Sequence, residues 1–125
     1  MLRLLLLVAA GGAVGSVSRY LVQLAVARQL AHPFPLGTLL VNVLGCLLIG
    51  LFYALAEKGA LGSAELRLLL TTGFCGGFTT FSTFSYETLV LLENGSYFLL
   101  VLYVAGSVGL GLLATFGGVA LGRLL

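Results

Sequence analysis

The stretch that decides the fold is "GFCGGFTTFSTFSYE", residues 73–87. Its glycines, hydroxyl side chains and phenylalanines interrupt a sequence whose flanking segments consist largely of leucine. Gly76 and Gly77 are adjacent, and each glycine costs a helix interior up to about 1 kcal/mol relative to alanine. We therefore expect the helix that contains this stretch to break after Gly77.

The composition indicates that lipid is the main solvent of this 125-residue chain. Hydrophobic residues make up 60% of it, charged residues make up 8%, and the mean hydropathy is +1.18. Soluble domains contain about a quarter charged residues. A net charge of +2 without a basic run gives no support to nucleic-acid binding. Cys46 and Cys75 follow no metal or disulfide spacing and are interpreted as small buried thiols.

Four apolar segments are long enough to cross a bilayer, which takes about 20 helical residues. They are residues 4–27, 36–56, 68–86 and 97–121. Short turns join them, so the prediction is an all-α membrane protein with a single four-span transmembrane domain over residues 1–125. The third helix is interrupted near its middle. Apolar character resumes after Arg19, which favours an uncleaved first helix over a removed signal peptide.

The distribution of basic residues gives only a weak preference for one orientation in the membrane. With four spans both termini share a side, and that side holds Arg3, Lys58, Arg67 and Arg123. The opposite side holds Arg28, together with Arg19 if its side chain reaches that interface. The excess of basic residues favours termini inside the cell. The excess is small, so the chain is expected to insert in both orientations.

Polar side chains at membrane depth are functional candidates because they are costly unless paired or hydrated. Arg19 either extends its charge to an interface or stands at the mouth of an anion path. Asn42 either joins helices or offers its NH2 group to an anion. Tyr103 and Ser107 share a helix face, although a serine bonded to its own helix is a common alternative.

The predicted spans contain no deeply placed carboxylate and no group of residues that could form a catalytic site. Glu87 lies at the end of the third apolar segment, and no acidic residue lies deeper. A proton-coupled pump usually has an ionisable carboxylate near the midplane. His32 lies in a loop with no nucleophile and base around it. The sequence therefore argues against a proton-driven exporter and against an enzyme.

A break in the third helix would free backbone groups for ion binding. Unwound carbonyls and half-helix ends hold ions in other membrane proteins, and hydroxyl residues follow the glycines directly. Phe78, Phe81 and Phe84 recur at every third position. Rings pack in most cases, but the edge of a ring is positive and attracts an anion. These residues predict an anion path lined by donors, without identifying the anion.

Three motifs together resemble the Fluc (CrcB) family of fluoride channels: "GGAVGSVSRY" (11–20), "GTLLVNVLG" (37–45) and "GFCGGFTTFSTFS" (73–85). The resemblance covers all four spans. It implies an antiparallel, dual-topology homodimer in the cell membrane. Such a dimer has two pores and exports fluoride by passive permeation.

The resemblance also implies roles for individual residues. Backbone carbonyls of Gly76 and Thr79 from both subunits would hold a structural Na⁺ at the dimer centre, and Arg19 would lie in the vestibule. At Gly111 some relatives have a hydroxyl, so the end of the polar track is open. The implied fluoride pore consists of Asn42, Phe81, Thr83, Phe84, Tyr103 and Ser107.

Two other classes of protein share the size of this chain. A small four-span, dual-topology multidrug exporter would need a carboxylate in its first span, where this sequence has Arg19. A structural subunit of a larger membrane complex would make the polar track incidental. Fluoride efflux, proton-coupled drug uptake or neither, measured in liposomes, separates the three classes.

Overall fold

The computed structural model describes residues 1–125 and is helical throughout, with no strand. α3, η1 and α4 follow one another without a break and form the first half of the third span, and α5 forms the second half. The elements are α1 (Leu2–Gln29), α2 (Leu36–Glu57), α3 (Ala64–Leu68), the π-helical η1 (Leu69–Cys75), α4 (Gly76–Phe78), α5 (Phe81–Glu93) and α6 (Tyr97–Leu124).

The predicted spans agree with these helices, and the third is longer than predicted. α1, α2 and α6 are each apolar and long enough to cross a membrane. The third span covers residues 64–93 instead of 68–86. It begins earlier because Ser63 caps its start, where the side chain accepts a hydrogen bond from the Leu66 N–H at 3.1 Å. It ends later because α5 continues to Glu93.

The predicted break in the third helix is confirmed, but its position after Gly77 is wrong. Gly76 has helical backbone angles, φ −62° and ψ −38°, and α4 continues through Gly77 to Phe78. The extended residues are Thr79 and Thr80. Gly77 instead serves packing, because a Cβ there would meet the Gly12 carbonyl group and lie 2.9 Å from the Gly12 Cα.

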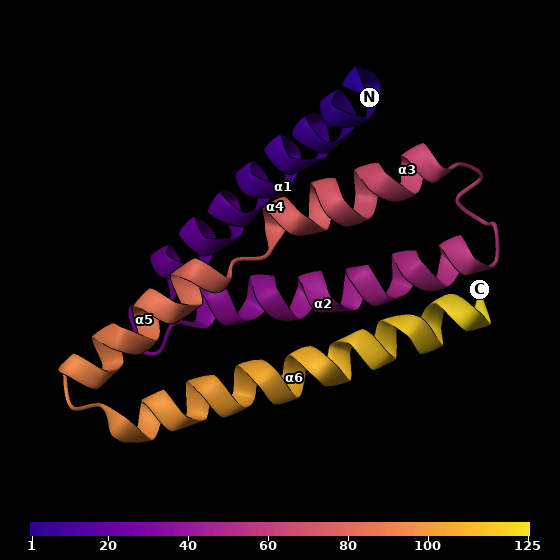
Figure 1. The fold of residues 1–125 in the computed structure, drawn as a ribbon. Helices are drawn as coiled ribbons and strands as arrows, with labels where there is room; N and C mark the ends of the chain where they lie inside the picture. Colours follow the sequence, from indigo (N-terminus) through magenta and orange to yellow (C-terminus); the bar gives the residue numbers. More distant parts are fainter.

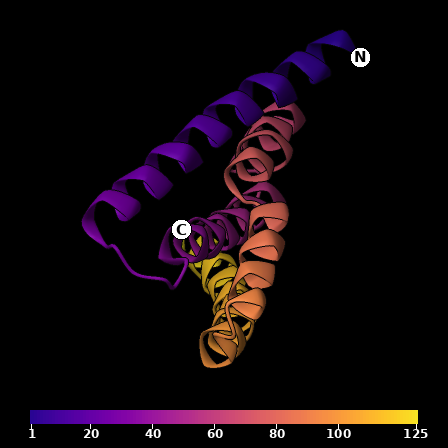
Figure 2. The same cartoon turned by 90° about the vertical axis from the view of Figure 1, so that its left-hand side faces the viewer.

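The helices pack as two layers that share the third span. α2 packs most extensively on α6, while α1 packs on η1 and α4 and has no contact with α6. Figure 2 shows α1 diverging from the α2–α6 pair, with the third span between them. The close approaches rely on glycine: a Cβ at Gly11 would lie 2.5 Å from the Leu69 carbonyl oxygen, and one at Gly122 would lie 2.6 Å from the Ala54 Cβ.

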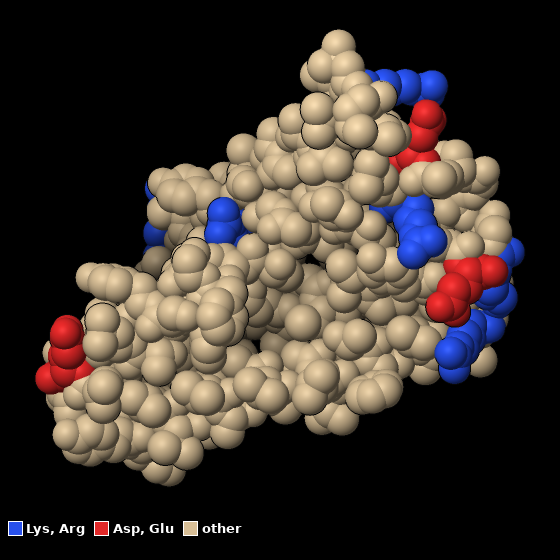
Figure 3. All heavy atoms as spheres, viewed as in Figure 1, with Lys and Arg blue, Asp and Glu red and all other residues tan.

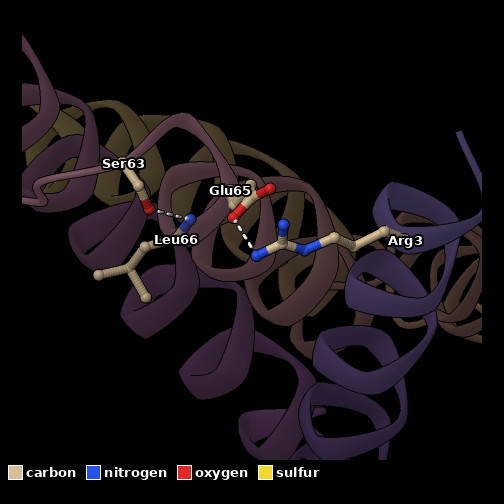
Figure 4. A network of polar contacts seen from close by, with 4 residues as sticks. All are labelled: Arg3, Ser63, Glu65 and Leu66. Carbon is tan, nitrogen blue, oxygen red and sulfur yellow. Dashed lines mark hydrogen bonds and ion pairs between the residues drawn. The ribbon is translucent and has the colours of Figure 1, made fainter.

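Both termini and the α2–α3 loop lie at one end of the molecule, as predicted (Figure 1). Arg3 pairs with Glu65 at 2.8 Å at this end (Figure 4). The Lys58 ammonium donates to the carbonyl oxygens of Gly122, at 3.5 Å, and Arg123, at 2.8 Å, which caps the carboxyl end of α6. Most of the charge in Figure 3 gathers here, so this end has the features of a membrane–water boundary.

Candidate functional site

One side chain from α2 bonds to the backbone at the break in the third span. In a continuous helix the Thr80 N–H would bond to the Gly76 carbonyl, four residues earlier. Here it donates to Asn42 Oδ1 at 2.8 Å, and Asn42 Nδ2 donates to the Thr80 carbonyl oxygen at 3.1 Å. A single amide therefore satisfies both backbone groups of Thr80. Asn42 keeps one N–H that is not used in this pair.

The start of α5 is capped by the Thr80 side chain. Thr80 Oγ1 accepts a hydrogen bond from the Thr83 N–H at 3.2 Å and donates to Thr83 Oγ1 at 3.1 Å. The Thr83 N–H would otherwise reach the Thr79 carbonyl in a continuous helix. Both predicted cation ligands, the carbonyls of Gly76 and Thr79, have therefore lost their regular helical donors to specific side-chain contacts.

A groove of about 480 Å³ runs between α2 and the first half of the third span. It brings together Asn42, Gly76, Thr79 and Phe81, four of the residues that the sequence analysis singled out. A Cβ added at Gly76 would meet nothing within 4 Å, so the helix backbone is open to the groove there. We call this cavity the α2–α4 groove.

A second cavity of about 540 Å³ lies where α1 ends and α2 begins. A chain of polar contacts lies along it: Gln23 Nε2 donates to Thr38 Oγ1 at 3.1 Å, and Thr38 Oγ1 donates to Glu87 Oε1 at 2.7 Å. Tyr103 Oη donates to the other carboxylate oxygen at 2.8 Å. Thr83, a predicted pore residue, also lines this cavity. We call it the α1–α2 pocket.

The predicted pore phenylalanines start a chain of aromatic rings between the two cavities. The Phe81 and Phe84 centroids are 5.6 Å apart, with the rings tilted by 44°. Phe84 lies 5.1 Å from Tyr103, whose ring meets Phe34 edge-on at 5.5 Å. Phe81 is 79% exposed, whereas Tyr103 is fully buried. The rings thus lead from an open surface into the core.

Two predicted site residues have no partner in the chain. The Ser107 hydroxyl oxygen is buried and makes no hydrogen bond. It lies one turn beyond Tyr103 on α6. An unmet buried donor is costly unless a ligand or water satisfies it. Arg19 is partly buried in the middle of α1, forms no ion pair, and lines neither the α2–α4 groove nor the α1–α2 pocket.

Sequence reasoning missed three members of this network: Gln23, Thr38 and Glu87. Thr38 lies one helical turn before Asn42, so helical periodicity indicates that the two share a face of α2. Glu87 was placed at the end of the third span. It lies within α5, where Thr38 and Tyr103 hold it. α5 continues beyond the apolar segment to Glu93, so Glu87 lies inside the helix and not at its end.

Comparison with known proteins identifies the family. The model of the family described as "CrcB-like protein, Camphor Resistance (CrcB)" matches residues 6–119. The chain belongs to the CrcB family. This confirms the resemblance found in the three motifs and excludes the multidrug exporter as its family.

Three curated relatives of this CrcB chain are named "Fluoride-specific ion channel FluC". The relative from Phocaeicola vulgatus is 54% identical over 93 residues, which cover 74% of this chain and 76% of the relative. The relative from Bacteroides fragilis is 57% identical over 90 residues, covering 70% of each chain. The relative from Geobacter sulfurreducens is 56% identical over 94 residues, covering 75% of this chain and 76% of the relative.

These names describe channels and not enzymes, in agreement with the sequence analysis. Together with the three long apolar helices, they make the chain a multi-pass membrane protein.

Proposed function

We propose that this chain forms a fluoride channel that lets the anion leave the cell passively. The observation that carries the proposal is the identity of more than half of the aligned residues with relatives named as fluoride-specific ion channels. The donor-lined geometry supports it. An inside-negative membrane potential drives an anion outward, at about 2.3 kcal/mol per charge for each 100 mV. Passive permeation in that direction lowers fluoride in the cytoplasm.

The pore donors are neutral, which suits a small and strongly hydrated anion. Asn42 has an N–H left over from its pair with Thr80, and the buried Ser107 hydroxyl has no partner. Thr83 lines the α1–α2 pocket. Such donors replace the hydration shell in steps without trapping the ion. The edges of Phe81 and Phe84, followed by Tyr103, add weak attraction between these steps.

The Glu87 carboxylate does not rule out an anion path. Each of its oxygens accepts a short hydrogen bond, one from Thr38 and one from Tyr103. Charge-assisted bonds of this kind are strong and hold both carboxylate oxygens in place. Arg19, a partly buried cation of α1 with no carboxylate partner, would raise the anion concentration in a vestibule.

The channel is proposed to be an antiparallel homodimer. Phe81 is 79% exposed on a single chain, and the backbone at Gly76 is open. Hydroxyls of Ser82 and Ser85 also face outward from α5. Hydroxyls at membrane depth need a polar or protein environment, which a second copy over the α2–α4 groove provides. The weak charge bias permits the opposite orientation of the two copies.

The centre of this dimer is proposed to hold a structural Na⁺. The fit is chemical: the carbonyls of Gly76 and Thr79 have lost their regular helical donors, and both residues line the open groove. Unwound carbonyls are the usual Na⁺ ligands in membrane proteins. The ion would fix the two breaks against each other. A high-resolution map of the dimer should show a compact density at oxygen distances typical of sodium, and a density with longer, water-like contacts contradicts the site.

Efflux from liposomes tests the function. Purified protein is reconstituted in vesicles loaded with fluoride or with chloride, and the anion is released down its gradient with a potassium ionophore. The expected result is rapid fluoride efflux and little chloride efflux. Equal efflux of both anions, or none of either, overturns the proposal.

Orientation is tested separately in cells. A tag at the amino terminus should be accessible from both sides of the membrane in a population of wild-type channels. A tag that is accessible from one side alone contradicts dual topology and leaves the conduction result untouched.

A further inference from the structure

A third cavity, of about 280 Å³, lies at the end of the molecule where α2 stops and α3 starts. Gly59, Gly62, Ser63 and Arg67 are among the residues that line it. Both glycines have positive φ values, 72° and 73°, and a Cβ added at either would meet nothing within 4 Å. The loop backbone is therefore open to this cavity, which we call the α2–α3 hollow.

Arg67 is the cation of this hollow, and no carboxylate engages it. Its Cζ atom lies over the Tyr53 ring, 5.0 Å from the centroid. The one ion pair in the structure joins Arg3 to Glu65. A guanidinium presents its face to an aromatic ring and keeps its N–H donors in its own plane. Tyr53 therefore holds the Arg67 guanidinium in place, and the guanidinium N–H groups donate to no group of the chain.

Other charged side chains near the hollow already have partners within the chain. Glu65 is held by Arg3, and Ser63 caps the backbone at Leu66 (Figure 4). Lys58 donates to backbone carbonyls at the end of α6. The carboxylate at this end without a cation partner is Glu57, at the last residue of α2. It does not line the hollow, whereas Arg67 does and forms no ion pair.

We infer that the α2–α3 hollow binds the phosphate group of an anionic phospholipid. The planar donors of arginine match phosphate oxygens in a two-point contact. The hollow lies at the end of the molecule that holds both termini and most of the charged side chains, where we expect lipid headgroups. Leu66 is 38% exposed beside Arg67 and gives the acyl chains an apolar surface. This site is independent of the proposed fluoride path.

Retention of lipid by the purified full-length protein tests the inference. The wild-type protein in detergent is mixed with phosphatidylglycerol or with phosphatidylcholine, and bound lipid is counted by native mass spectrometry. Phosphatidylglycerol should be retained in preference. Arg67→Gln should lower its retention about fivefold, as expected for one basic residue near an anionic headgroup.

Arg28→Gln is the matched control. Arg28 is an exposed arginine without an ion pair, in the last turn of α1 at the opposite end of the molecule. This variant should retain phosphatidylglycerol as the wild type does. Arg67→Lys keeps the charge but loses the planar fork, so an intermediate retention is expected, and it serves as the second variant if Arg67→Gln does not fold.

Three results overturn the inference. Equal retention of the two lipids by the wild-type protein removes the preference for an anionic headgroup. Equal loss in Arg67→Gln and Arg28→Gln reduces it to a general charge effect. Displacement of the lipid by millimolar inorganic phosphate, with binding of the free anion instead, assigns the hollow to soluble phosphate.

Discussion

The third and fourth spans both contain adjacent glycines, but only the third span is interrupted. α6 has six glycines and remains one helix of 28 residues. The third span breaks beside an adjacent glycine pair, but both glycines of the pair are helical. The break falls at Thr79 and Thr80, where Asn42 and the Thr80 hydroxyl offer other partners to the backbone. A membrane helix therefore opens where its N–H groups find replacement partners, and glycine alone does not open it.

The largest expected effect tests whether the broken span builds the pore. Replacing both rings, Phe81→Ile and Phe84→Ile, keeps apolar bulk but removes the positive edges. Fluoride efflux from liposomes should fall by an order of magnitude or more, since about 1.4 kcal/mol of added barrier is a factor of ten. Thermal stability of the assembled protein should change little.

A matched pair from α6 provides the control for the phenylalanine prediction. Phe98 and Phe116 are 79% and 71% exposed on α6, outside the aromatic chain. Phe98→Ile with Phe116→Ile should leave efflux near the wild-type rate. Similar efflux from both double variants would make the rings of the third span packing residues.

The second prediction concerns the amide that holds the break. Asn42→Asp keeps an acceptor for the Thr80 N–H but removes the donor to the Thr80 carbonyl. It also places a negative charge beside the path. Fluoride efflux should be suppressed, and the unfolding free energy should fall by about 1–3 kcal/mol because a buried carbonyl is left without a donor.

Asn42→Asp distinguishes two roles of the amide. Lost efflux with retained folding indicates that its free N–H serves the anion. Normal efflux with lowered stability indicates that Asn42 only joins the helices, and it contradicts the pore role.

The third prediction separates glycines that pack from glycines that face open space. Gly77→Ala brings a methyl group against the Gly12 backbone. The variant should lose about 1–3 kcal/mol of stability, as overpacked sites do. Gly109→Ala on α6 meets nothing within 4 Å in a single chain and should be neutral or gain up to about 1 kcal/mol. Thermal unfolding in detergent measures both, and equal effects would contradict the packing role of Gly77.

The smallest expected effect belongs to the unpartnered hydroxyl of α6. Ser107→Ala removes a buried donor that bonds to nothing in the chain, so stability should stay the same or rise slightly. Fluoride efflux should fall roughly two- to tenfold, the value of one hydrogen bond of about 0.5–1.5 kcal/mol. Thr115→Ala is the control, because that hydroxyl donates to the Gly111 carbonyl of its own helix at 3.1 Å. A Ser107→Ala channel with wild-type efflux would remove Ser107 from the path.

The sequence by itself determined the class of the protein and most of its helices. Apolar runs of sufficient length predict spans wherever they occur, because lipid leaves a backbone no other way to satisfy its polar groups. The spans therefore agree with α1, α2 and α6 at their ends to within a few residues. Glycine spacing likewise predicts close helix packing, which Gly11 and Gly122 provide.

Only the tertiary structure decided where the third helix breaks and what surrounds it. The break depends on Asn42, which lies 38 residues before its partner Thr80. Helix propensities of the residues around Thr80 contain no information about a partner so far away in the sequence. The same holds for Glu87: its sequence context places it at the edge of an apolar run, but Thr38 and Tyr103 bring it into the core. Local residue preferences amount to about 1 kcal/mol each. A buried backbone group without a partner costs as much or more, so the contacts between spans overrule the local sequence.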